Sequence, residues 1–180
     1  PGAKCRILQK KVKWCIIKVT NASRRILKVK IKNARKLAQK THKTPKFEPN
    51  KWKNAMGAGC YPYALNLLKN EFFVVGELIG KRCTEKTSNE VLVETLKEEL
   101  DVLGYNAEEI DVEDSISEDE MKIYLQREEN TGYYHFLRED ADGFWSHKYP
   151  NELPTREDSA GYLIKDPEAM VEVPFTGWCF

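Results

Sequence analysis

The feature that most restricts how this chain can fold is the separation of its charges. Residues 1–47 contain 16 of the 29 Lys and Arg residues and none of the 28 Asp and Glu residues. Residues 48–180 therefore hold 13 basic and 28 acidic residues, a net charge of −15. Such an asymmetry is typical of a basic arm on a separate acidic domain. We place the arm at residues 1–46 and the domain at residues 47–180.

The charge and composition indicate several partners and one compartment. The arm could bind nucleic acid, anionic lipid or the acidic domain of its own chain, and charge alone does not choose among them. No apolar run approaches the roughly 20 residues of a transmembrane helix. Five scattered cysteines without a C-x-x-C pair argue against a disulfide framework or a zinc ribbon. We therefore expect an intracellular, cytoplasmic protein, or one delivered into a host cell.

Hydrophobic spacing predicts helices in the first part of the chain. Residues 27–38 have helical spacing within the arm, whereas residues 11–19 fit a strand or a helix. Residues 60–68 follow two glycines and should form a helix that begins at Cys60. A longer helix is expected from a capping box at Thr87 to a stop at Gly104.

In the second part of the chain apolar and polar residues alternate with a period of two, which predicts strands. We expect strands at residues 121–125, 133–137 and 144–147, and a last one at residues 171–180. Helices followed by an antiparallel sheet give an α+β fold.

Cys60 is the candidate nucleophile because of its place at a predicted helix N-terminus. Partial positive charge and free N–H groups at such a site favour the thiolate. Gly57 and Gly59 leave the backbone open to a substrate, and Asn54 could donate to the oxyanion formed on a carbonyl. The alternative is that Cys60 is a small buried apolar residue and that Asn54 is an ordinary turn residue.

His135 and His147 are the candidate base and orienting group. A three-residue hairpin loop at residues 141–143, with Gly143 in the left-handed region, would pair Leu137 with His147. The two histidines would then share a face as diagonal neighbours, about 7–8 Å apart at the backbone. His147 could hold the His135 ring in the tautomer that accepts the thiol proton. Each histidine could equally be an ordinary strand residue with a backbone hydrogen bond.

Two kinds of metal site are weak alternatives. Cys60, His135 and His147 match no recognised zinc spacing and lack an evident fourth ligand. Residues 139–143 lack most of a calcium-binding loop. We therefore expect neither a metal nor a cofactor.

The residues around the cysteine and the histidines resemble papain-like cysteine peptidases. Asn54, five intervening residues and Cys60-Tyr61 are similar to the Gln-x5-Cys-Trp element of that clan, with Asn in place of Gln. A histidine as third member, as His147 would be, resembles NlpC-type cell-wall peptidases, while bacteriocin-processing peptidases use Asp at a comparable position. The resemblance is concentrated in residues 54–68 and 133–149.

This resemblance implies a papain-like fold and a thiol hydrolase that cleaves an amide or peptide bond. Cys60 would form the acyl-enzyme, His135 would act as general base, His147 would orient His135, and Asn54 would stabilise the oxyanion. Deamidating and transglutaminase-like enzymes, including toxin or effector domains, use the same thiolate attack. The competing hypothesis is a non-catalytic module that binds nucleic acid or an anionic surface through its basic arm.

Overall fold

The protein is described by a computed structural model, which covers the backbone of residues 15–21 and residues 44–117, 120–128 and 131–171. Its centre is a five-stranded sheet in the order β2-β1-β3-β4-β5, with every neighbouring pair antiparallel. In chain order the strands are β1 (Cys15–Asn21), β2 (Tyr105–Ile110), β3 (Met121–Arg127), β4 (Tyr134–Glu139) and β5 (Trp145–His147). The predicted α+β class is confirmed.

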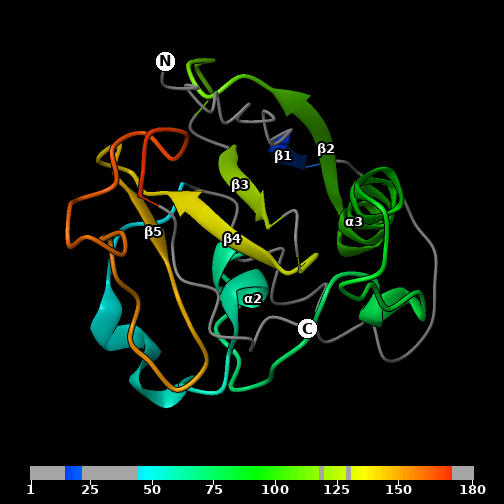
Figure 1. The fold of residues 1–180 in the computed structure, drawn as a ribbon, viewed down its shortest axis with the longest axis horizontal. Coiled ribbons are helices and arrows are strands. Elements are labelled where there is room, and N and C mark those ends of the chain that lie inside the picture. The colour runs from blue at the N-terminus through cyan, green and yellow to red at the C-terminus, as the bar shows by residue number, and fades with distance from the viewer. Residues whose placement is uncertain (1–14, 22–43, 118–119, 129–130, 172–180) are drawn as a thin grey trace, which may run out of the picture.

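Two helices and two short 3-10 turns complete the described fold. They are the turn η1 (Pro49–Asn54), the helix α2 (Cys60–Ala64), the turn η2 (Glu77–Ile79) and the helix α3 (Asn89–Leu103). Figure 1 shows α3 alongside β2 and α2 beside β4, and the contacts between these elements agree.

The long helix was predicted from its apolar stripe, and only its cap differs by one residue. Ser88, rather than Thr87, is the N-cap, and its hydroxyl accepts a hydrogen bond from the Val91 N–H. Gly104 ends the helix with φ 91°, a conformation that glycine adopts without strain. Leu92, Leu96, Leu100 and Leu103 form the apolar stripe of the helix and are buried.

The helix that begins at Cys60 is shorter than its apolar pattern suggests. It ends at Ala64, and Asn66 takes a left-handed backbone conformation with φ 52°. The Leu67 N–H then bonds the Pro62 carbonyl at 2.9 Å, which closes the turn. Leu65 and Leu67 are buried nonetheless, because the chain after the helix still packs on the core.

The hairpin between β4 and β5 has the predicted register. Leu137 lies opposite His147, and Gly143 is left-handed with φ 81°. The Asp140 N–H bonds the Phe144 carbonyl at 2.8 Å, so the loop is the expected three residues.

The first strand comes from the segment that the sequence assigned to the basic arm. β1 occupies the middle of the sheet, between β2 and β3. Residues 1–14 and 22–43 of the arm, including the helix predicted at residues 27–38, lie outside the described residues, as does the strand predicted beyond Val171. The division at residue 46 therefore stays a prediction, although at least residues 15–21 form part of the sheet.

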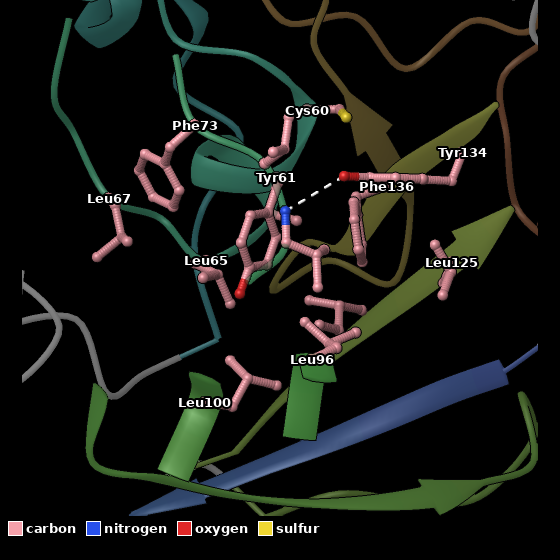
Figure 2. Packing of buried hydrophobic residues seen from close by; sticks show 14 of the residues in the cluster. Cys60, Tyr61, Leu65, Leu67, Phe73, Leu96, Leu100, Leu125, Tyr134 and Phe136 are labelled. Carbon is pink, nitrogen blue, oxygen red and sulfur yellow. Dashed lines mark hydrogen bonds between the residues drawn. The ribbon is translucent and has the colours of Figure 1, made fainter. Parts of the chain in front are cut away.

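The main core lies between the sheet and the helices α2 and α3. It contains Tyr61 and Leu65 from the α2 region, the leucines of α3, and Ile123, Tyr134 and Phe136 from the sheet. Figure 2 shows this packing and the hydrogen bond from the Val75 N–H to the Tyr134 hydroxyl, 3.2 Å long. A second cluster of Tyr124, Leu137, Trp145 and Ile164 covers the opposite face of the sheet.

A buried carboxylate joins α3 to the segment that follows α2. Glu99 is fully buried and accepts hydrogen bonds from the Tyr61 hydroxyl at 2.7 Å and from the Gly76 and Leu78 N–H groups at 3.0 and 2.8 Å. Burial raises the pKa of Glu99, and these three donors act in the opposite direction.

We expect Glu99→Gln to lower the free energy of unfolding by about 1–3 kcal/mol, because the amide would turn an N–H donor toward a group that itself donates. Glu98→Gln is the matched control, since the exposed Glu98 only pairs with Lys81 and should cost less than about 1 kcal/mol. Urea denaturation of both variants measures the difference. Equal losses would show that the three donors do not depend on the Glu99 carboxylate.

Candidate functional site

Cys60 is the first residue of α2 and belongs to the main core. Its relative exposure is 2%, and it shares a cluster with Tyr134 and Phe136. In Figure 2 its sulfur is directed away from the ring of Tyr61, which points into the core. The N-cap is Gly59, where an added Cβ would come within 2.7 Å of the Phe72 ring. A larger residue at position 59 would therefore displace the partly exposed Phe72 ring from the segment that leads into Cys60.

A buried lysine that the sequence analysis did not single out holds the same segment. The Lys148 ammonium donates hydrogen bonds to the carbonyls of Met56, Ala58 and Tyr149 at 2.8, 2.5 and 3.0 Å. Burial lowers the pKa of Lys148 to about 8, while Glu152 and Cys60 act in the opposite direction. The lysine thus places a positive charge within electrostatic range of the Cys60 sulfur.

The two predicted histidines lie together, as the register required. His135 Nε2 and His147 Nδ1 are 3.1 Å apart, and the other ring nitrogen of His147 lies 3.1 Å from the Glu157 carbonyl oxygen. Both rings are buried, and the ring of Tyr149 packs on them with centroid distances of 4.7 and 5.4 Å. One imidazole therefore orients the other, and the Glu157 carbonyl holds the second ring.

Strand alternation places this pair on the face of the sheet turned away from α2. The residues that contact α2 are Phe136, which packs on the Tyr61 ring at 5.0 Å, and Ser146, whose hydroxyl lies 2.7 Å from that of Tyr63. Successive strand residues point to opposite faces. His135 and His147 therefore lie on the same face of the sheet as Leu137 and Trp145, which belong to the second core cluster.

The geometry brings a lysine, rather than a histidine, to the α2 side of β5. Lys148 follows His147 directly and so points the other way, toward the segment before Cys60. The role of His135 as the base for Cys60 stays a prediction. In the sequence, the only sign of this lysine is its position directly after His147, which places it on the opposite face of the strand.

The remaining predicted site residue lies on the surface. Asn54 is exposed at the end of η1, six residues before Cys60 in the chain. Its role as an oxyanion donor also stays a prediction. Asp142, in the loop between β4 and β5, accepts two hydrogen bonds from Arg156, at 2.8 and 2.7 Å.

A network of two arginines and two aspartates fixes the hairpin loop. The fully buried Asp140 accepts from Arg138 at 3.3 Å and from Arg156 at 3.1 Å. Arg138 also donates to the Tyr63 carbonyl at 3.1 Å and lies 4.0 Å from the centroid of the Tyr63 ring. A cavity of about 390 Å³ beside this loop is lined by Lys46, Phe47, Ala141, Asp142 and Arg156.

An acidic surface covers the opposite end of the sheet. It consists of nine exposed carboxylates between residues 90 and 114, with Lys97 as the one basic residue in that range. Its members are Glu90, Glu94, Glu98 and Asp101 on α3, Glu108 and Glu109 on β2, and Asp111, Glu113 and Asp114 in the following loop. Glu109 lies on the face of β2 that α3 covers, where Lys97 binds it, and Glu108 lies on the other face, so acidic side chains occupy α3, both faces of β2 and the following loop.

Two further properties follow from the described part of the chain. Within it, no group of three or more His, Cys, Asp or Glu side chains is arranged to hold a metal ion. The longest helix in that part, α3, has 15 residues, and none of its helices is long and apolar enough to cross a bilayer.

Comparison with known proteins found a relative that spans most of the chain. A protein of Ruditapes philippinarum named insoluble matrix shell protein 1 is 30% identical over 139 residues, which are 74% of this chain and 87% of that protein. No protein-family model matches the chain. No solved structure matches it either.

The histidine pair should make the fold sensitive to acid. Burial first, and then His135, lower the pKa of His147 from 6.5 to about 3. The folded protein favours the neutral His147 ring. The contribution of this ring to the free energy of unfolding is therefore complete above pH 6.5 and is lost as the pH falls toward 3. We expect stability to fall in this window by up to about 1.4 kcal/mol per pH unit, and His147→Gln to flatten the slope. Denaturation of both proteins from pH 7.5 to pH 4.5 measures it, and identical slopes would contradict the assignment.

Proposed function

We propose that this chain, which belongs to the family of the insoluble matrix shell protein 1 of Ruditapes philippinarum, is a self-assembling component of an insoluble organic matrix. The observation that carries the proposal is the separation of charge along the chain: the first 47 residues contain 16 basic residues, and residues 48–180, the body of the protein, have a net charge of −15. The relative's name places that protein in an insoluble shell matrix. We accordingly propose secretion, in place of the intracellular compartment expected from the cysteine pattern.

Opposite charges on one molecule provide an attraction between copies. The basic residues of one copy can bind the acidic surface of a neighbour, and each copy offers both partners. Single exposed ion pairs contribute only about 0–1 kcal/mol, but many of them act together here. The net charge of the whole chain is +1, so little long-range repulsion opposes association.

The acidic surface is better suited to this role than the rest of the body. Its carboxylates are exposed and lie on two elements that pack together, α3 and β2. Outside it, buried basic residues such as Lys148 and Arg138 already satisfy local carbonyls and carboxylates. Residues 48–180 can therefore offer a partner mainly acidic groups, whereas residues 1–47 can offer basic groups.

A thiol hydrolase of papain-like fold is the second candidate, and the Lys148 ammonium favours it. A positive charge near a thiol stabilises the thiolate, which is the nucleophilic form. Lys148 also fixes the carbonyls of Met56 and Ala58, directly before Cys60. The Cys60 thiolate would attack an amide carbonyl, and the C–N bond would break to give a thioester and a protonated amine or ammonia. Water or a second amine would then attack the thioester and release the thiol, which gives hydrolysis, deamidation or acyl transfer. The peptide substrate and the roles of His135, His147 and Asn54 belong to this candidate.

The matrix proposal predicts assembly that depends on salt. We expect the full chain to sediment as large assemblies in about 50 mM NaCl and to stay dispersed when several hundred mM NaCl is present from the start, because the Debye length shortens from roughly 14 Å to below 8 Å. Light scattering and pelleting measure this. A chain that stays monomeric at low salt, or that assembles equally well when high salt is present from the start, would overturn the proposal.

Two triple variants test whether the acidic surface is the binding site. Glu94→Gln, Glu98→Gln and Glu113→Gln together remove three of its charges. The control of Glu71→Gln, Glu152→Gln and Glu168→Gln makes the same change in net charge at exposed positions elsewhere. We expect the first triple variant to stay dispersed at a lower salt concentration than the control. Equal behaviour would show that net charge alone controls assembly.

The hydrolase candidate predicts an unusually reactive thiol. Iodoacetamide near pH 6.5 should alkylate Cys60 before the other four cysteines, and Lys148→Met should slow that reaction about tenfold or more, because the ammonium favours the thiolate. Lys86→Met, at an exposed position, is the control. Peptide mapping by mass spectrometry gives the rates. A Cys60 that reacts no faster than the other four thiols would exclude this candidate.

A further inference from the structure

The strand β1 fills a slot between two strands that do not pair with each other. It forms six residue pairs with β2, from Ile16 opposite Ile110 to Asn21 opposite Tyr105. It forms five pairs with β3, from Cys15 opposite Leu125 to Val19 opposite Met121. Without a strand in this position, both β2 and β3 would face the gap with unpaired backbone N–H and C=O groups. The sheet is therefore incomplete unless some copy of residues 15–21 occupies the slot.

The chain connection does not require the occupant to come from the same molecule. Between Asn21 at the end of β1 and Thr44, whose hydroxyl bonds the Glu120 carbonyl, there are 22 residues. Covalent geometry allows that many residues to span up to about 75 Å, well over the diameter of a domain of this size. A strand on such a connection can reach the slot of its own body or that of a neighbour.

The charges around β1 and around its slot are opposite. Five Lys and Arg residues lie in residues 4–13, and seven more lie in residues 24–36, so basic residues flank the strand on both sides. The slot borders the acidic surface, since β2 carries Glu108 and Glu109 and leads into the loop with Asp111. Within the ladder itself, Lys18 lies opposite Glu108. A strand that enters the slot therefore brings positive charge to the acidic surface.

We propose that in the assembled state β1 of one copy occupies the slot of the next copy. This inference rests on the proposed matrix function and specifies how the copies are joined. Each copy donates one strand and accepts one, so the contact is head-to-tail and can extend without limit. The donated strand makes the same backbone ladder as before, and so the exchange costs no pairing energy.

Protein concentration decides between the two arrangements. A connection of this length gives the strand an effective concentration on the order of millimolar at its own slot. A dilute solution therefore favours the strand in its own body. A packed matrix, where neighbouring slots exceed that concentration, favours exchange.

A cross-strand disulfide distinguishes the two arrangements directly. Lys18→Cys with Glu108→Cys places two thiols at paired positions of β1 and β2, where the Cα separation suits a disulfide. The double variant is refolded at low and at high protein concentration, oxidised, and analysed on gels without and with reductant. We expect an internally linked monomer from dilute samples and a ladder of covalent oligomers from concentrated samples and from pelleted assemblies.

The control shifts one cysteine to the opposite face of β2. In Lys18→Cys with Glu109→Cys, position 109 pairs with Ile17, so the two thiols point to different faces. This variant should give no ladder beyond that of the single variants. Internal linkage at every concentration, including within the pellet, would overturn strand exchange, as would no specific linkage at all. Assembly that high salt still prevents would leave the matrix proposal standing, whereas the loss of assembly would remove both.

Discussion

The pairing of one strand on both of its edges is the interaction on which this fold depends. β1 comes from the part of the chain that carries no acidic residue, yet it lies at the centre of the sheet, next to the acidic β2. Its backbone supplies the hydrogen bonds that join β2, and with it α3, to β3, β4 and β5. The basic N-terminal region is thus structural as well as charged, and any role of its charges is coupled to the position of this strand.

Much of the fold could be predicted because periodicity reports local structure. The α3 stripe and the three strands after residue 120 were visible in the spacing of apolar residues, and the loop with Gly143 indicated the hairpin register. The centre of the sheet was not visible. Residues 11–19 are apolar enough for a strand or a helix, and the choice is made by β2 and β3, which lie about 90 residues or more away in the chain.

The candidate site shows the same limit at the level of side chains. The predicted register of the β4–β5 hairpin places His135 beside His147, and the structure confirms this contact. The sequence does not predict whether the two histidines face α2 or the opposite side of the sheet. That choice depends on how Tyr61 and Tyr63 pack against β4 and β5. Lys148 was missed for a related reason. A lysine is normally exposed, and only the carbonyls of Met56, Ala58 and Tyr149 make its burial favourable.

The arginine network at the hairpin determines more than the shape of a loop. If Asp142 and Gly143 alone formed a two-residue turn, Ala141 would pair with Phe144, and every residue of β5 would move to the other face. An imidazole would then approach the Cys60 side, and the ammonium would leave it. Arg156 prevents that slip by binding Asp140 and Asp142 at once. The Arg156 guanidinium thereby favours the register in which Lys148, rather than His147, lies on the side of β5 that faces α2.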